Sequence, residues 1–313
     1  MIHIVCPNPA VDRTLLFEKI QKSLPNRPKE IREFPGGKGF NVAYALQYKQ
    51  PEEMIIHTML GGNYGQQVAD LAKDLGYQLK ITKIATNTRI CNILIDQSQQ
   101  DIFPLYERGF ELDEETLNDF TCQLVKTVND GDYLVFSGSL MQGMPADYTF
   151  RVKNLLQLQG KQVNLCVDTS GPALLNTYQE SSPYLVKIND EEILDIFPNE
   201  KLETTNDYLK LLQNKVDPKI PYFIITLGKD GVIARAKGTF YFASAKKVIA
   251  NNPIASGDFF LGRLMAGLSQ HQTFSKTLQD AVTFSTTNVL NWYPEVFSEQ
   301  LLEVAQTITI KEL

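Results

Sequence analysis

The sequence is poor in the residues that build disulfide scaffolds and histidine-rich metal sites. It has four cysteines in 313 residues, none in a C-x-x-C pair, and three histidines that lie far apart along the chain. Three of the cysteines, Cys6, Cys91 and Cys166, lie in apolar runs, as buried free thiols do. These features argue against a disulfide framework, a histidine metal site and a Ser-His-Asp triad, and they indicate a reducing, cytoplasmic compartment.

Long apolar runs and blocks of like charge are missing as well. No apolar run approaches the roughly 18 residues of a membrane-spanning helix, and the short run at residues 1–6 lacks the basic start of a signal peptide. With 30 Lys and Arg against 36 Asp and Glu, the formal net charge is −6. We therefore expect neither a membrane nor a nucleic acid as a partner, and any bound phosphate must be held by a few placed groups.

What the sequence does have is an alternation of buried-strand and helix patterns. Continuous apolar runs, typical of parallel strands covered on both faces, recur at residues 54–60, 133–136, 163–167, 184–188 and 222–226. Helix-period segments lie between them, and the last 57 residues, from Gly257, are predicted to be mostly helical. The alternation predicts a doubly wound α/β sandwich, and we expect residues 1–313 to form a single domain.

Two stretches, residues 13–34 and 88–106, interrupt this alternation. Each contains two strand-like segments, so each predicts a strand pair inserted among the β-α units. Together they predict a small β-sheet lid over one end of the main sheet. Its partly apolar outer face favours burial against a second copy of the chain.

The segment Pro35-Gly36-Gly37-Lys38-Gly39 directly precedes a predicted helix over 40–48. Glycines let a backbone approach a ligand closely, and the free amides at a helix start hold anions or hydroxyls. The segment lacks the G-K-[ST] of a Walker motif. A plain strand-to-helix turn is the alternative interpretation.

The segment Ala255-Ser256-Gly257-Asp258 also begins a predicted helix. A carboxylate beside an amide-rich turn suits a base next to a phosphoryl site. Asp258 could equally serve only the helix start, where a negative charge is favoured. Both interpretations stay open on this motif alone.

Asn189 and Glu192 follow the run at residues 184–188 and are three positions apart. An amide and a carboxylate could hold Mg²⁺ through water. The same spacing fits a capping box, with Asn189 as N-cap and Glu192 at the third helical position.

Three further features are candidates for ligand contact. The segment Thr226–Gly231 could wrap the phosphates or ribose of a nucleotide, or be a plain hairpin loop. The segment Ser137–Ser139 ends a buried strand, and open α/β sheets bind ligands at such carboxyl ends. Arg27 and Arg89 lie in the two lid stretches, where a bound phosphate could reach them.

Taken in order, these segments resemble the PfkB (ribokinase-like) family of sugar kinases. The matching residues are Asn8–Asp12, Gly36–Gly39 with Asn41, Thr88–Arg89, Ser137–Ser139, Asn189 with Glu192, Thr226–Gly228, and Ser256–Asp258. Each motif is weak alone, but seven in the right order over nearly the whole chain are specific. Asn252–Pro253 and Met144–Tyr148 lean toward the tagatose-6-phosphate kinases, which are close relatives of the 1-phosphofructokinases.

The resemblance implies a ribokinase-like fold, with a mostly parallel sheet sandwiched by helices and a small β-sheet lid. It implies ATP-dependent phosphoryl transfer, with Mg²⁺, to the C1 hydroxyl of a ketohexose 6-phosphate. D-tagatose 6-phosphate is the first expectation, which would place the chain in lactose and galactose catabolism. It also implies a homodimer formed through the lid. A 1-phosphofructokinase and a non-catalytic sugar-phosphate-binding protein are the alternatives.

The resemblance also implies roles for single residues. Asp258 would be the base, and the amides of Ala255, Ser256, Gly257 and Asp258 would form an anion hole. The sugar and its phosphate would contact Asp12, Arg27, Gly36, Gly37, Lys38, Asn41, Arg89 and Ser139. The nucleotide would lie along Lys187, Thr226, Gly228, Gly231 and Asn288. Asn189 and Glu192 would organise Mg²⁺.

The sequence departs from the family pattern near the predicted anion hole. Ala255 stands where the family usually has glycine, and a φ above zero there would strain an alanine by about 1 kcal/mol. We expect instead a φ that is open to alanine, so that Ala255→Gly has little effect. Phe259 and Phe260 replace small residues, Ile188 replaces a proline, and Asn291–Pro294 lacks the usual glycine. These departures leave the nucleotide preference open.

Overall fold

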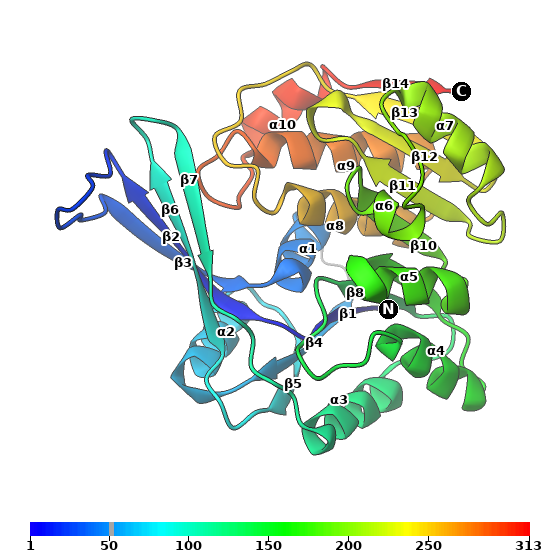
Figure 1. The fold of residues 1–313 in the computed structure, drawn as a ribbon, viewed down its shortest axis with the longest axis horizontal. Coiled ribbons are helices and arrows are strands. Elements are labelled where there is room, and N and C mark those ends of the chain that lie inside the picture. The colour runs from blue at the N-terminus through cyan, green and yellow to red at the C-terminus, as the bar shows by residue number, and fades with distance from the viewer. Residues whose placement is uncertain (50–52) are drawn as a thin grey trace.

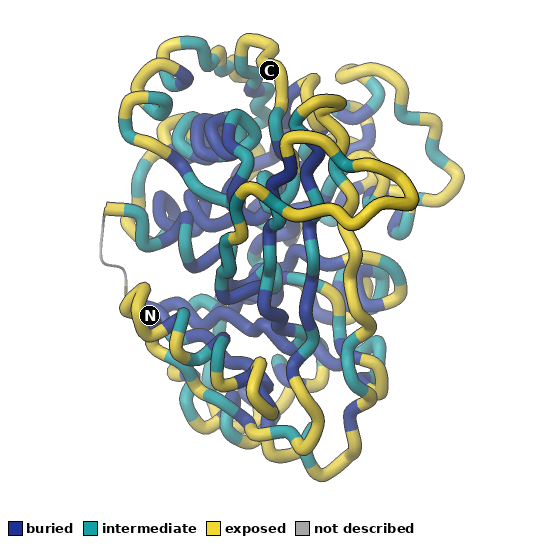
Figure 2. The backbone as a smooth tube through the Cα atoms, turned by 90° about the vertical axis from the view of Figure 1, so that its left-hand side faces the viewer, coloured by how far each residue is buried: buried dark blue, intermediate teal, exposed yellow. Residues whose placement is uncertain are grey.

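The computed structural model describes residues 1–49 and 53–313, which form a large sheet covered by helices on both faces and a smaller sheet that projects from one end (Figure 1). Buried residues concentrate in the middle of the molecule, and exposed ones lie in the peripheral connections (Figure 2). The predicted α/β fold with a lid is therefore confirmed.

Within the described ranges the large sheet has ten strands. In spatial order they are β14 (Thr309–Glu312), β13 (Thr239–Ser244), β12 (Val232–Ala236), β11 (Tyr222–Thr226), β10 (Leu185–Asn189), β9 (Asn164–Asp168), β8 (Tyr133–Ser137), β1 (Ile2–Cys6), β4 (Met54–Leu60) and β5 (Leu79–Lys83). The strands from β11 to β5 are parallel, and β12, β13 and β14 add antiparallel strands at one edge. The carboxyl ends of the parallel strands thus meet at one edge of the sheet, where ligands of such folds bind.

Helices cover both faces because the parallel strands are apolar on both sides. One apolar core lies under α1 (Lys38–Gln47), α2 (Gly62–Asp74), α8 (Ser256–Ser269) and α9 (Phe274–Asn288). The other lies under α3 (Glu114–Thr127), α4 (Tyr148–Leu158), α5 (Gly171–Ser181), α6 (Ile193–Ile196) and α7 (Thr205–Asn214). Ile4 and Val5, neighbours in β1, point into different cores, as the period of two in a strand requires. No helix in the described part of the chain is long and apolar enough to cross a membrane.

The small sheet is the predicted lid. Its strand order is β3–β2–β6–β7, with β2 spanning Ala10–Phe17, β3 Glu30–Gly36, β6 Arg89–Asp96 and β7 Asp101–Tyr106. The two predicted insertions thus supply both strand pairs, although β2 begins at Ala10 rather than at residue 13. The inner face of the lid packs on Ile254, Trp292 and Tyr293 from the C-terminal part of the chain.

The C-terminal region is less uniformly helical than predicted. After α10 (Ser298–Ala305), the chain adds β14 to the edge of the large sheet beside β13. A four-residue strand with little periodicity of its own is decided by its neighbour in the sheet, which a local pattern does not reveal.

Candidate active site

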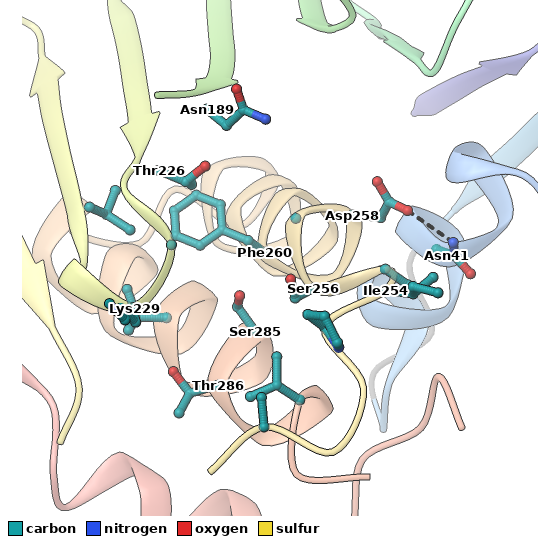
Figure 3. Close-up of a pocket in the computed structure, with 18 of the residues that line it drawn as sticks. Asn41, Asn189, Thr226, Lys229, Ile254, Ser256, Asp258, Phe260, Ser285 and Thr286 are labelled. Carbon is teal, nitrogen blue, oxygen red and sulfur yellow. Dashed lines mark hydrogen bonds between the residues drawn. The ribbon is translucent and has the colours of Figure 1, made fainter. Parts of the chain in front are cut away.

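A cavity of about 720 Å³ opens at the carboxyl ends of the parallel strands, between the lid, the starts of α1 and α8 and the C-terminal half of α9. Figure 3 shows its lining, with Asn189 and Thr226 at strand ends on one side and Asp258 and Asn41 on the other. Segments far apart in the sequence therefore converge on one hollow. Most of the residues predicted for ligand binding lie there.

The glycine segment before α1 lets β2, β3 and the start of α1 approach one another closely at the cavity. A Cβ atom on Gly36 would lie 2.2 Å from Cγ of Asp12, and Gly37 has a φ of +104°. Gly37 is the N-cap of α1, so only glycine fits the turn without strain. The result is that the Asp12 carboxyl faces the cavity beside the start of a helix. Burial raises the pKa of Asp12 to about 6, although a hydrogen bond from the Gly37 amide and the charge of Arg89 oppose this rise.

Asp258 lies in the first turn of α8 and is almost completely buried. Nδ2 of Asn41 donates a hydrogen bond to its Oδ2 at 2.9 Å (Figure 3). Burial raises the pKa of Asp258 to about 7, while the charge of Lys38 opposes the rise. A carboxyl group with this pKa can accept a proton near neutral pH.

The turn before α8 contradicts one expectation. Ala255 has φ +66° and ψ −3°, which is left-handed, so the expected φ open to alanine is wrong. The Ser256 amide donates to the Pro253 carbonyl at 3.3 Å. The amides of Gly257 and Asp258 lie in the first helical turn, where no carbonyl of the same helix precedes them. Of the four amides of the predicted anion hole, only that of Ser256 has an acceptor among the described residues, so the amides of Ala255, Gly257 and Asp258 are left to a ligand.

Lysines surround this turn. A Cβ atom on Gly257 would lie 2.9 Å from Nζ of Lys187, so the ammonium lies directly beside the start of α8. Lys187 is buried and lines the cavity, and Lys38 lines it from α1. The helix start, with its partial positive charge, and two ammonium groups together make a strong site for anionic oxygens.

Asp168, at the end of β9, joins the two lysines and was missed by sequence reasoning. Its Oδ1 lies 3.4 Å from Nζ of Lys187 and 3.8 Å from Nζ of Lys38. The charge of Asp168 is the main cause that raises the pKa of Lys38. Its Oδ2 is buried and has no hydrogen-bond partner among the described atoms. A carboxylate at the carboxyl end of a buried strand was the signal that could have revealed it.

Asn189 and Glu192 make the reciprocal hydrogen bonds of the predicted capping box, although α6 begins only at Ile193, with Glu192 as its N-cap. Oδ1 of Asn189 accepts from the Glu192 amide at 2.7 Å, and Oε2 of Glu192 accepts from the Asn189 amide at 2.9 Å. Both residues nevertheless line the cavity, so capping does not exclude ligand contact. Burial, followed by the charge of Asp168, raises the pKa of Glu192. Within residues 1–49 and 53–313, no three His, Cys, Asp or Glu side chains form a preassembled metal site.

The segment after β11 is both a hairpin and part of the cavity. A short 3₁₀ turn, Gly228–Asp230, joins β11 to the antiparallel β12, and Thr226, Gly228 and Gly231 line the hollow. A Cβ atom on Gly231 would lie 2.3 Å from the Ala243 carbonyl oxygen. Sequence reasoning did not single out the other polar residues on this side, which are Lys229, Lys246, Lys247, Ser285 and Thr286.

Four of the predicted residues, Gly36, Arg27, Ser139 and Asn288, do not line the cavity. Arg27 is exposed in the connection between β2 and β3, and Ser139 accepts from Nδ2 of Asn8 at 3.5 Å; neither lines the cavity. Asn288 does not line it either, because its Nδ2 donates to the Ile254 carbonyl at 2.8 Å. Arg89 does line it, while its guanidinium donates to the carbonyls of Asn8, Pro9 and Glu107.

The bulky departures after Asp258 are accommodated by the core. Phe259 stacks on Tyr44 with ring centroids 5.1 Å apart, and Phe260 packs in the core under α8 while its ring borders the cavity (Figure 3). Ile188, in place of the expected proline, is fully buried in β10. These substitutions fill the interior and leave Asp258 in place.

Comparison with known proteins identifies the class. The family model of the pfkB family carbohydrate kinases matches residues 6–293. The chain belongs to this family. It is therefore a sugar kinase, and the family implies ATP as the phosphoryl donor.

Solved structures share the fold at low sequence identity. Phosphofructokinase-2 from Escherichia coli, in complex with substrates and products, is 21% identical with a TM-score of 0.88, covering 97% of this chain and 98% of that one. A protein from Thermotoga maritima described as a possible 1-phosphofructokinase is 20% identical with a TM-score of 0.84, covering 100% and 99%. These likenesses support the ribokinase-like architecture.

Proposed function

We propose that this kinase transfers a phosphoryl group from ATP to the C1 hydroxyl of a ketohexose 6-phosphate, with D-tagatose 6-phosphate as the first candidate. The observation that carries the proposal is the buried Asp258 carboxyl beside two free helix-start amides and the Lys187 ammonium. Phosphoryl transfer needs positioning and charge stabilisation more than covalent chemistry, and this arrangement supplies both.

Each group has a distinct part in the reaction. Asp258 accepts the proton of the attacking hydroxyl, and Asn41 orients the carboxylate through the bond to Oδ2. The amides of Gly257 and Asp258 stabilise the charge on the transferring phosphoryl oxygens. Lys187 and Lys38 add positive charge, and Asp168 holds both ammonium groups toward the cavity.

Mg²⁺ fits the residues present, and of the predicted pair we favour Glu192 as a ligand. Because Oδ1 of Asn189 already accepts two backbone amides, the better donors are Glu192 and the unpartnered Oδ2 of Asp168. Burial, followed by the charge of Asp168, raises the pKa of Glu192, and a bound cation would oppose that rise. A bound Mg²⁺ would neutralise phosphate charge.

The choice of sugar substrate rests on fewer observations than the phosphoryl transfer does. Asn252–Pro253 and Met144–Tyr148 favour a tagatose-6-phosphate kinase, whereas fructose 1-phosphate as acceptor would make the chain a 1-phosphofructokinase. The strained Ala255 is the observation that favours a binding protein without turnover. The retained Asp258, buried and bonded to Asn41, favours the kinase.

Coupled assays of ADP release test the proposal. Tagatose 6-phosphate, fructose 6-phosphate and fructose 1-phosphate are compared at equal concentrations with Mg-ATP, and the Asp258→Asn variant serves as the background. We expect turnover with tagatose 6-phosphate at the highest kcat/KM. Preference for fructose 1-phosphate establishes the 1-phosphofructokinase, and binding without ADP release establishes the binding protein.

A further inference from the structure

The turn at residues 291–295 contacts the inner side of the lid. The Arg32 guanidinium of β3 lies 4.0 Å from the ring centroid of Tyr293, and its Nη1 donates to Oε1 of Glu295 at 3.2 Å. Trp292 and Tyr293 also pack in the apolar cluster that contains the lid residues Leu16, Ile93 and Ile95. The position of this turn therefore depends on the position of the lid.

The same turn is bonded to the loop that carries the anion-hole amides. Asn252 is buried; its Nδ2 donates to the Trp292 carbonyl at 2.9 Å, and its Oδ1 accepts from the Ile254 amide at 3.0 Å. The carbonyl of the same residue, Ile254, accepts a hydrogen bond from Nδ2 of Asn288 at 2.8 Å. Ile254 is thus held by side-chain amides at both its N–H and its carbonyl.

Ile254 immediately precedes Ala255, so only one residue separates it from the first residue of α8, Ser256. An alanine in the left-handed region occupies a narrow range of φ and ψ, so a displacement of Ile254 moves the start of α8 with it. Ile254 itself packs in the lid cluster. A continuous series of contacts therefore runs from Arg32 to Tyr293, and through its neighbour Trp292 to Asn252. From Asn252 it continues through Ile254 to the start of α8, where the amides of Gly257 and Asp258 lie.

We propose that Asn252 is a positioning residue that transmits the position of the lid to the anion hole through the 291–295 turn. The inference rests on the proposed function, because it assigns the amides of Gly257 and Asp258 to the transferring phosphoryl group. In this arrangement, closing the lid over the sugar completes the site for the nucleotide. Phosphoryl transfer to water in the absence of sugar is thereby disfavoured.

Trp292 provides a direct readout because it is the only tryptophan in the sequence. Titrating the wild-type protein with a non-hydrolysable ATP analogue should change the Trp292 emission. In Asn252→Ala this response should be lost while calorimetry shows that the analogue still binds. Asn251→Ala is the matched control: its Nδ2 donates to the Leu290 carbonyl at 2.7 Å across the same junction, so the response should persist.

Enzyme kinetics test the same series of contacts, beginning with Arg32 in the lid. Arg32→Gln and Asn252→Ala should each lower kcat about tenfold, the effect of one lost positioning interaction, with KM values changed by less than about threefold. The double variant should be no slower than Asn252→Ala, because both changes break one chain of contacts. Lys29→Gln, an exposed lid lysine paired with Glu18, is the control and should keep wild-type kcat.

The outcomes separate the two proposals. No turnover of any sugar by the wild-type protein overturns the proposed function, and the fluorescence titration still decides the coupling. A wild-type response in Asn252→Ala, or multiplied losses in the double variant, overturns the coupling alone. If Asn252→Ala does not fold, Arg32→Gln carries the test: an unchanged Trp292 response together with an unchanged kcat refutes the inference.

Discussion

At the scale of single residues, the Asp258 carboxyl decides whether this site transfers a phosphoryl group. Its pKa is raised to about 7 by burial, and a base must be deprotonated to act. We therefore expect kcat/KM to rise as the pH increases through about 7 and then to level off. Asp258→Asn should lower kcat by about 10²–10⁴-fold, the usual effect of losing a general base. Calorimetry should show nearly unchanged binding of sugar and nucleotide.

The outcome that removes Asp258 from catalysis is equally clear. If Asp258→Asn keeps more than about a tenth of the wild-type kcat, the residue serves only the start of α8. Asn41→Asp is the companion variant, since it replaces the donor to Oδ2 with a second carboxylate. It should shift the rise in kcat/KM to higher pH, because like charges raise each other's pKa.

Ala255 is the second residue-scale case. The left-handed φ of +66° strains an alanine by about 1 kcal/mol, which corresponds to about fivefold in the population of the competent loop. Ala255→Gly should therefore raise kcat several-fold and raise the melting temperature. Ala255→Val should do the opposite, because β-branching disfavours this region further. Equal kcat for all three would show that the loop is held in place irrespective of strain.

At the scale of elements, strands β1 and β4 bury a histidine pair away from the cavity. Nε2 of His57 lies 3.0 Å from Nδ1 of His3, whose Nε2 lies 3.0 Å from Oδ2 of Asp132. Burial lowers the pKa of His57 to about 3, so His57 is neutral in the folded chain. The unfolded chain takes up a proton near pH 6.5, so this contribution to stability is complete above that pH and is lost as the pH falls toward 3.

This linkage predicts an acid-sensitive stability. Between pH 7 and pH 5 the free energy of unfolding should fall by about 2 kcal/mol more in the wild-type protein than in His57→Gln. Urea titrations at each pH measure the difference. His271→Asn changes an exposed histidine and is the control, with a pH dependence expected to match the wild type. Parallel curves for wild type and His57→Gln would refute the role of the pair.

The helices and strands also show how much of the fold and of the site could be predicted from the sequence. Strands such as β8 and β11 were predicted because continuous apolar runs report burial on both faces, and the lid strands because they interrupt the β-α alternation. The φ of Ala255 was predicted wrongly, since a retained Ser256-Gly257-Asp258 says nothing of the turn before it. Asp168 was missed because its role depends on two lysines from other strands and helices, which only the fold brings together.

At the scale of the whole molecule, the outer face of the lid presents an apolar row to solvent. The strand register places Ile31, Leu15, Leu94 and Phe103 side by side across the four lid strands. Ile31 is 53% and Phe103 44% exposed, and Leu105 lies next to the row at 55%. An apolar row on a sheet face is favoured to be buried against another surface, and a second copy of the lid presents the same row, so it is the occupant that this face fits.

The predicted homodimer is tested by breaking this row without touching the cavity. Phe103→Glu places a charge in the middle of the proposed interface, where it has no partner, and should convert the dimer to a monomer in light scattering. Leu158→Glu is the matched control, because Leu158 is 77% exposed on α4, outside the lid, and its variant should remain dimeric. Since the lid also carries Asp12 and Arg89 into the cavity, the monomer should show a raised KM for the sugar phosphate. A wild-type chain that is monomeric at micromolar concentration would refute the lid interface, and the sugar side of the site would then be complete within one protomer.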